Sequence, residues 1–159
     1  MTEPPDAAEP LGRDAPPGDT RPLSDTRPLS DRDYRSLAQF RHALRVFLRF
    51  SEDAARAAGV TPAQHQLMLA VKGWSGGGAP AISDLAEFLQ LKHHSTVELV
   101  QRATTAGLVT TSTDPADHRR QLVELTAEGD DTLASLSSLH RDELRRFRAE
   151  MVDILDELD

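Results

Sequence analysis

Apolar residues recur at intervals of three and four along much of this chain, which is the spacing of an amphipathic helix. One such pattern, in the segment 32–60, predicts a helix from residue 32 to about residue 58 that ends near Gly59. It is carried by Leu37, Phe40, Leu44, Phe47 and Leu48. A longer one runs over residues 127–159. At ~1.5 Å per residue, about 30 residues of helix extend ~45 Å, longer than a small domain is wide. Both stretches are therefore predicted to be dimerisation helices, an N-terminal helix and C-terminal helices, that cover their apolar faces with a second copy.

Residues 61–126 are instead predicted to form several short elements. Thr61-Pro62-Ala63-Gln64 has the form of a capping box, and the helix that it opens is expected to continue to about Trp74, where Ser75–Pro80 interrupts it. A short helix with Ser83 as its expected N-cap comes next and turns at Gln90-Leu91. A second helix follows from about His93 to Ala106. Gly107 is expected to end it in a left-handed conformation.

Two β-rich runs come after Gly107. Val109, Thr111 and Thr113 are expected to alternate outward along the first run, and residues 122–125 form the returning run. Between them lies the polar tip Asp114–Arg120. A helix, a turn, a helix and then a hairpin with arginines at its tip is the order of a winged helix-turn-helix. The predicted fold is therefore mainly α with a small β-hairpin wing, flanked by N- and C-terminal dimerisation helices.

The helix over residues 93–106 is expected to bury a stripe of Thr96, Leu99, Val100 and Ala103. At ~1.5 Å per residue it is ~20 Å long, suited to a major groove ~12 Å wide. The residues on its other face are candidates for DNA contact: His93, His94, Ser95, Val97, Glu98, Gln101 and Arg102. Ser, Gln, Arg and His can donate to bases or phosphates, and a carboxylate can accept from a cytosine amino group. The alternative is an ordinary solvated helix face.

The hairpin tip offers a second candidate contact. Asp117 and Arg119 are close enough in sequence for an ion pair that stiffens the tip. His118, Arg119 and Arg120 can then reach phosphates or enter a narrow minor groove, whose negative potential attracts cations.

The net charge of −8 is unusual for a DNA-binding protein, but the acids are unevenly distributed. Residues 127–159 carry four Arg and ten acids, whereas residues 91–126 carry four basic and four acidic side chains. The acidity therefore lies outside the candidate DNA-contacting segment and does not veto a local contact. No cysteine is present, which excludes disulfides and thiolate metal sites. Neither a membrane span nor a secretory signal is visible, so a cytoplasmic protein is expected.

Residues 1–31 hold most of the ten prolines and many acids, and the sequence Thr20–Asp25 is repeated at once as Thr26–Asp31. This composition predicts a disordered tail, because it cannot bury enough apolar area to offset the entropy of ordering. The repeat is interpreted as a duplication within that tail; a docking motif is the alternative.

The segment from Asp117 to Thr126 resembles the wing signature D-x-R-x-x-x-x-x-L-T of the MarR (multiple antibiotic resistance regulator) family. Leu85-Ala86-Glu87, Gly107-Leu108-Val109 and Thr126-Ala-Glu-Gly129 fit the flanking positions, and the similarity covers about residues 34–158. The resemblance implies a homodimeric transcription factor, usually a repressor, that binds a pseudo-palindromic double-stranded operator and is released by small molecules, often aromatic acids. His118 stands where such proteins often carry Arg, and Glu98 where the helix is often basic or neutral. The C-terminal helical region is also shorter than in many relatives.

The chain has no nucleophile elbow, His-Glu-x-x-His pair or dinucleotide glycine fingerprint, so neither catalysis nor a cofactor is predicted. No metal site is predicted, since His93 and His94 are adjacent and do not face one point on a helix. A metal-responsive regulator with a composite site across the dimer and a protein-interaction module that has lost DNA binding stay open. Phe47, His65, Met68 and Trp74 are candidates for lining a small-molecule crevice, or equally for the core.

Overall fold

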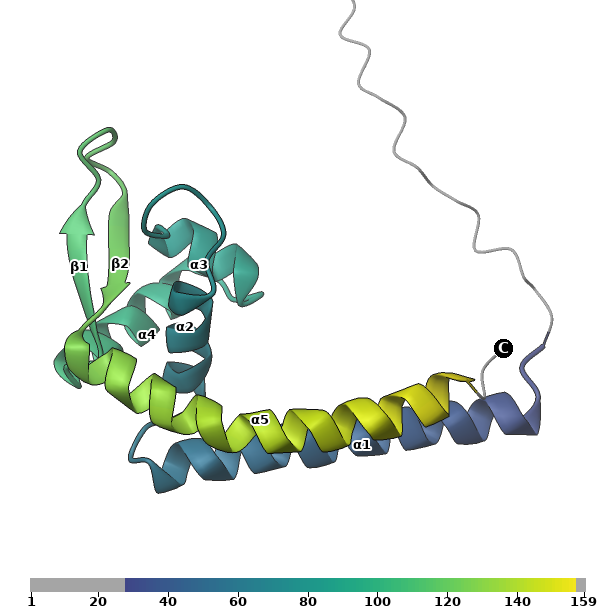
Figure 1. The fold of residues 1–159 in the computed structure, drawn as a ribbon. Coiled ribbons are helices and arrows are strands. Elements are labelled where there is room, and N and C mark those ends of the chain that lie inside the picture. The colour runs from purple at the N-terminus through teal and green to yellow at the C-terminus, as the bar shows by residue number, and fades with distance from the viewer. Residues whose placement is uncertain (1–27, 157–159) are drawn as a thin grey trace, which may run out of the picture.

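The computed structural model describes residues 28–156, and these residues form five helices and one two-stranded sheet. The elements are α1 (Asp31–Ala57), α2 (Pro62–Lys72), α3 (Ile82–Phe88), α4 (His93–Thr105), β1 (Val109–Thr113), β2 (Gln121–Leu125) and α5 (Ala127–Asp156). In Figure 1 α1 and the C-terminal part of α5 form a long arm (residues 31–57 and 139–156). The remaining elements form a lobe (residues 58–138) at one end of the arm. This mainly helical fold with a β-hairpin confirms the predicted fold class.

The start of α1 is fixed by a capping box. Asp33 N–H donates to Ser30 Oγ (3.3 Å), and Ser30 N–H donates to Asp33 Oδ2 (2.7 Å). Two backbone donors that the first turn leaves without helical partners are thereby satisfied. The helix ends at Ala57, and Gly59 follows with φ +79°, as the sequence predicts. The predicted tail falls almost wholly outside the described residues.

The C-terminal region is one continuous helix, not several. Thr126 Oγ1 accepts from Gly129 N–H (3.0 Å) at its start, and α5 then runs for 30 residues without proline or a further glycine. Its first turns contribute Leu133 and Leu136 to the core of the lobe, and its last turns pack on α1. The helix therefore belongs to both parts and fixes their relative position.

Most of the buried apolar side chains lie in the lobe, where they form one core built from α2, α3, α4, both strands and the adjoining ends of α1 and α5. The arm has a smaller core of Ala43, Met151 and Ile154, with Phe40 and Phe147 packed against it. Two helices side by side can cover only one face of each other. Large apolar side chains therefore stay exposed along the arm; on α1 they include Leu37, Leu44 and Leu48.

The helix-turn-helix begins two residues earlier than expected. The N-cap of α3 is Ala81, not Ser83, and the Asp84 carboxylate accepts from Ala81 N–H (2.8 Å). Gln90 has φ +55°, which confirms the predicted turn between α3 and α4. The capping box of Thr61 and Gln64 is also confirmed (3.2 and 2.9 Å), although α2 ends at Lys72, two residues before Trp74.

The hairpin, hereafter the wing (residues 109–125), pairs β1 and β2 in antiparallel register, with Val109 opposite Leu125 and Thr113 opposite Gln121. Val109 is buried in the lobe, so the prediction that it points outward is wrong; Thr111 and Thr113 are exposed as expected. The base of the wing is docked on the segment before α3, because Val123 N–H donates to Pro80 O (2.9 Å). Among residues 28–156, no helix has the length and apolar character needed to cross a bilayer.

Candidate nucleic-acid interface

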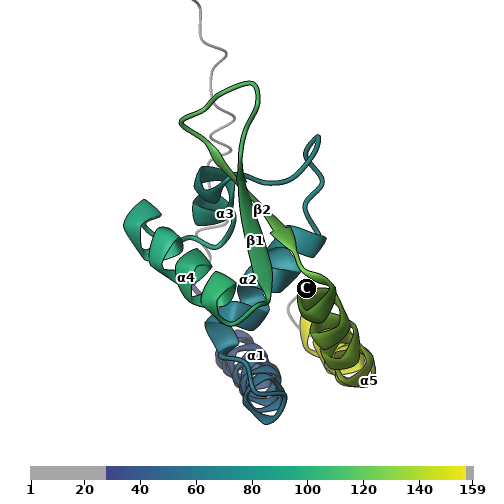
Figure 2. The ribbon, with the colours of Figure 1, turned by 90° about the vertical axis from the view of Figure 1, so that its left-hand side faces the viewer.

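Helix α4 has a buried face and a polar face. Thr96, Leu99, Val100 and Ala103 are buried, as predicted from their spacing. The Thr96 hydroxyl donates to Lys92 O (3.2 Å), which satisfies the one polar group on the buried stripe. This face packs on α3 and on the lobe core, so the opposite face is turned outward (Figure 2).

The predicted contact residues on the outward face of α4 differ in how exposed they are. His93, His94, Glu98, Gln101 and Arg102 are exposed, whereas Ser95 and Val97 are half-buried at its edge. Glu98 Oε2 lies 3.7 Å from Arg102 Nη1, one helical turn away. This pairing places a carboxylate beside the one arginine of the helix and lowers the positive charge that α4 can offer.

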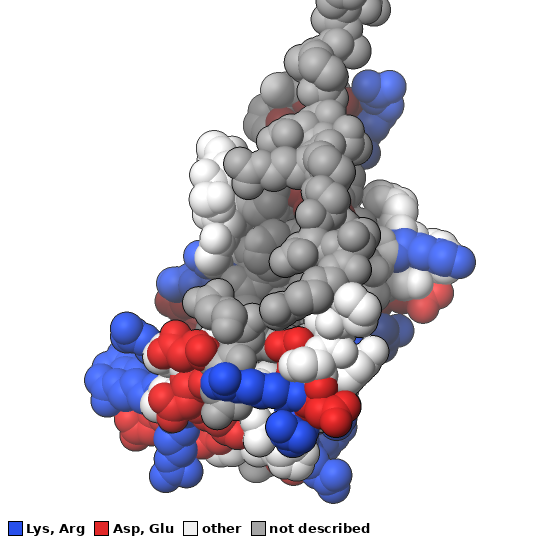
Figure 3. Space-filling model, turned by 90° about the vertical axis from the view of Figure 1, so that its right-hand side faces the viewer, with Lys and Arg blue, Asp and Glu red and all other residues white. Residues whose placement is uncertain are grey.

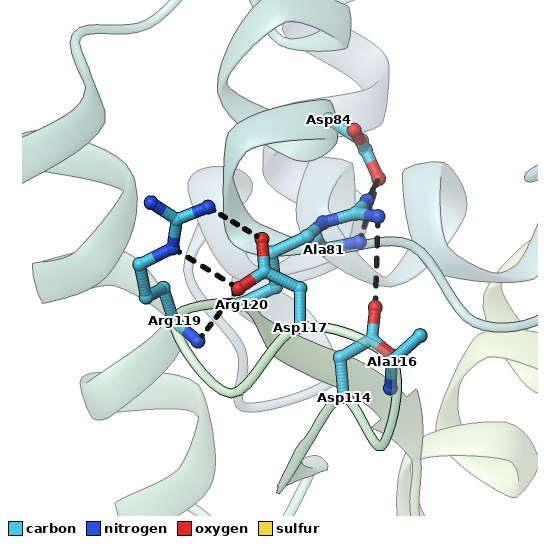
Figure 4. Close-up of polar contacts among 7 residues, drawn as sticks. All are labelled: Ala81, Asp84, Asp114, Ala116, Asp117, Arg119 and Arg120. Atoms are coloured by element: carbon cyan, nitrogen blue, oxygen red, sulfur yellow. Dashed lines mark hydrogen bonds and ion pairs between the residues drawn. The ribbon is translucent and has the colours of Figure 1, made fainter.

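At the tip of the wing, Arg119 is held by Asp117. Its Nε lies 3.1 Å from Asp117 Oδ1 and its Nη2 lies 3.2 Å from Oδ2, a two-pronged pairing that confirms the predicted ion pair (Figure 4). The side-chain and backbone hydrogen bonds from Arg119 hold the pKa of Asp117 below its ordinary value of 3.8. The pairing with Asp117 restricts the orientation of the Arg119 side chain. The side chain is still 91% exposed, so its guanidinium stays open to solvent.

Arg120, the next residue, is turned back toward the protein. Its Nη2 lies 2.9 Å from Asp84 Oδ2 and its Nη1 lies 3.5 Å from Asp114 Oδ2. The sequence placed His118, Arg119 and Arg120 together as contacts to DNA; the structure leaves His118 and Arg119 exposed and puts Arg120 between two carboxylates. Sequence reasoning missed the roles of Asp84 and Asp114, because nothing in the local pattern pairs residue 84 with residue 120.

The four candidate ligand residues do not come together. Met68 is fully buried in the lobe core, and His65 is buried against the His140 ring. Phe47 packs on Phe147 in the arm (ring centres 5.0 Å apart). Trp74 lines a cleft of about 540 Å³ between the end of α2, β2 and the start of α5, with Val71, Lys72, Pro80 and Leu125. Trp74 alone of the four is therefore in the described cleft.

No cluster of three or more His, Asp or Glu side chains suited to hold a metal ion occurs within residues 28–156.

Comparison with known proteins gives one family. Residues 58–120 match the sequence model of the MarR family. No curated protein sequence is significantly similar to the chain.

Among solved structures, the chain resembles AbsC, a MarR family transcriptional regulator from Streptomyces coelicolor, with TM-score 0.68 and 22% identity over 84% of this chain and 91% of that one. The S. aureus MepR–DNA complex matches with TM-score 0.62 and 18% identity, covering 74% of this chain and 83% of MepR. BpsR of Bordetella bronchiseptica matches with TM-score 0.58 and 22% identity, covering 74% and 86%. At these identities the likeness is one of fold.

Proposed function

We propose that this chain is a sequence-specific repressor. The match of residues 58–120 to the MarR family model and the likeness of fold to that family's transcriptional regulators support this. It binds double-stranded DNA as a homodimer in the cytoplasm, and a small molecule releases it. The observation that carries the proposal is the pairing of two outward polar elements on one lobe: the exposed face of α4 and the restrained, exposed Arg119 of the wing.

In this proposal α4 enters the major groove, and the wing carries Arg119 to an adjacent phosphate or minor groove. His93, His94, Gln101 and Arg102 are the contact residues on α4, with Glu98 as the acceptor; Ser95 and Val97 contribute from its edge. Asp117 contributes by orienting Arg119, and His118 lies beside it. MepR was solved on DNA with the same fold, which supports this placement.

A homodimer is supported by the arm. Leu37, Leu44 and Leu48 lie on one side of α1 with 36–44% of their surface exposed, and Leu144 and Leu155 of α5 are about half exposed. Large apolar side chains exposed along one side of a helix are typical of an interaction surface. Two-fold pairing through the arms would present two α4 helices to a pseudo-palindrome. Figure 3 shows acidic and basic side chains intermixed at the free end of the arm. Two arms that pair there would therefore not bring together surfaces of one charge.

Release by a small molecule is supported by the Trp74 cleft. The cleft contacts both β2 and the start of α5, so an occupant would touch the wing and the helix that continues into the arm. BpsR is regulated in its DNA binding by 6-hydroxynicotinic acid, which supports an aromatic acid as the class. In this chain the indole of Trp74 would contact such a ligand. The Lys72 ammonium, which pairs with Asp130 Oδ1 (2.6 Å) in the same cleft, would bind the acid by exchanging that partner.

The deciding experiment is selection from a pool of random duplexes with the full chain. Enrichment of one inverted repeat, bound with two chains per duplex, would support the proposal. A mobility shift with the enriched duplex then measures affinity for the chain and its variants. Failure to enrich any sequence at low salt would overturn it and favour the protein-interaction module.

A further inference from the structure

Arg119 and Arg120 are adjacent in sequence but have opposite surroundings. Arg119 points to solvent at the tip of the wing, while the Arg120 guanidinium lies against Asp84 of α3 and Asp114 of the wing (Figure 4). The Asp114 side chain is 14% exposed, so this arrangement is partly shielded from solvent. Shielding strengthens an ion pair relative to one on an open surface.

Asp84 connects the wing to the helix-turn-helix. Its Oδ2 accepts from Ala81 N–H (2.8 Å), which fixes the start of α3, and the same oxygen accepts from Arg120 Nη2 (2.9 Å). The residue that defines where the first helix of the motif begins therefore also binds the wing, across 36 residues of chain.

Asp114 completes the arrangement from the other side of the tip. Its N–H donates to Arg120 O (3.0 Å), and its carboxylate accepts from Ala116 N–H (2.8 Å). Arg120 thus closes the tip through its backbone and attaches it to α3 through its side chain. The base of the wing is attached separately, by the hydrogen bond from Val123 to Pro80.

We propose that Arg120 is a positioning residue that fixes the orientation of the wing on α3 and so determines where Arg119 meets DNA. This inference rests on the proposed function, in which the wing contacts DNA. A hairpin of two five-residue strands has little stability of its own, so its outer half needs an attachment to keep one orientation. The backbone contact at Val123 holds the base, and the Asp84–Arg120–Asp114 arrangement holds the part nearer the tip.

If Arg120 positions the wing, or if it contacts DNA itself, the substitution Asp84→Asn is expected to change the affinity for DNA in opposite directions. Asp84→Asn removes the charge that holds Arg120 but keeps an oxygen for Ala81 N–H. If Arg120 positions the wing, this variant weakens DNA binding. If Arg120 instead contacts phosphate, removing its competing carboxylate frees the guanidinium and tightens binding.

The experiment compares Asp84→Asn, Arg120→Met, the double variant and Arg119→Ala in the full chain. Arg145→Ala, which breaks an exposed ion pair on the arm, is the matched control. Affinity for the duplex enriched from the random pool is measured against salt concentration. Amide hydrogen exchange of residues 110–122 is measured without DNA.

The expected result is that Asp84→Asn and Arg120→Met each lower affinity about threefold to tenfold, as loss of a partly exposed ion pair would. The double variant loses no more than Arg120→Met alone, because that substitution already removes the ion pair with Asp84. Each speeds exchange in the wing and leaves the slope of log affinity against log salt unchanged. Arg119→Ala instead flattens that slope by about one, leaving exchange at the base of the wing unchanged.

Tighter binding by Asp84→Asn, a slope change in Arg120→Met equal to that of Arg119→Ala, or unaltered wing exchange in both variants would each overturn the inference. If the unaltered chain enriches no duplex, the proposed function fails, and the exchange measurement alone still decides whether Arg120 holds the wing.

Discussion

The imidazole ring of His65 in α2 lies 4.9 Å, centre to centre, from that of His140 in α5, and both side chains are buried where the lobe meets the arm. His140 Nδ1 lies 2.7 Å from Leu136 O, which can only accept, so this nitrogen carries a proton and donates. With a neutral ring, Nε2 then accepts from the Ser51 hydroxyl of α1 (2.9 Å). Three helices are thus joined through one buried histidine pair.

This pair predicts that folding stability falls as the pH is lowered below about 6.5. Burial, and next the charge of a nearby His140, lower the pKa of His65 from its ordinary value of 6.5. Between that value and the lowered one the unfolded chain binds a proton that the folded chain does not, so the contribution of His65 to stability decreases with falling pH and is fully present above the window. One proton gives a slope of at most about 1.4 kcal/mol per pH unit.

Urea unfolding between pH 8 and 5 measures this slope, and His65→Gln should reduce it. Because other carboxylates and histidines also titrate on acidification, the comparison is between the variant and the unaltered chain at each pH. His42→Gln, an exposed histidine on α1, is the matched control and should leave the slope unchanged. Equal slopes for all three proteins would contradict the prediction.

The helices, the helix-turn-helix and the wing were predictable because each has a local signature, as in the capping box of Thr61 and Gln64 or the glycine at position 107. The pairing of Asp117 with Arg119 was also local. Contacts between distant segments were not predictable: nothing in the sequence brings Arg120 to Asp84 or His65 to His140. The outward direction predicted for Val109 failed because the inward face of the hairpin was assigned wrongly: Val109 shares its face with Thr111 and with the buried Val123 opposite Thr111, and this face packs on the lobe core.

Gly129 shows how one such distant contact constrains a residue. In a helix, replacing glycine with alanine normally stabilises by up to ~1 kcal/mol. At position 129, however, a Cβ would clash with the backbone oxygen of Leu108, which cannot move without shifting β1. Gly129→Ala is therefore expected to lower the free energy of unfolding by about 1–3 kcal/mol, the cost of overpacking.

Thermal or urea unfolding tests this sign. Gly77→Ala is the matched control, since a Cβ there meets nothing within 4 Å, and its stability should stay the same or rise slightly. A stabilised Gly129→Ala would show that α5 and β1 can separate at this point without cost.

The exposed apolar face of the arm predicts the oligomeric state. The unaltered chain should sediment at twice its mass of 17.4 kDa, and Leu44→Glu should shift it toward the monomer, because burying a carboxylate in an apolar interface is costly. Leu69→Glu is the control: Leu69 is exposed to a similar extent but lies on the lobe. Sedimentation velocity distinguishes the two variants, and a dimer that survives both substitutions would place the interface elsewhere.

The ion pair between Glu98 and Arg102 predicts how α4 limits binding to DNA of any sequence. The carboxylate repels phosphates and holds the guanidinium 3.7 Å away along the helix surface. Glu98→Gln should therefore tighten binding to a random-sequence duplex and steepen the dependence of log affinity on log salt by up to about one phosphate contact. Glu150→Gln, an equal change in net charge on the exposed surface of the arm, is the control. Fluorescence anisotropy over a salt series measures both variants. If Glu98→Gln and Glu150→Gln tighten binding equally, the change in net charge alone explains the effect. A larger increase in affinity for Glu98→Gln would show that the carboxylate of Glu98 limits binding at the face of α4 that is proposed to enter the groove.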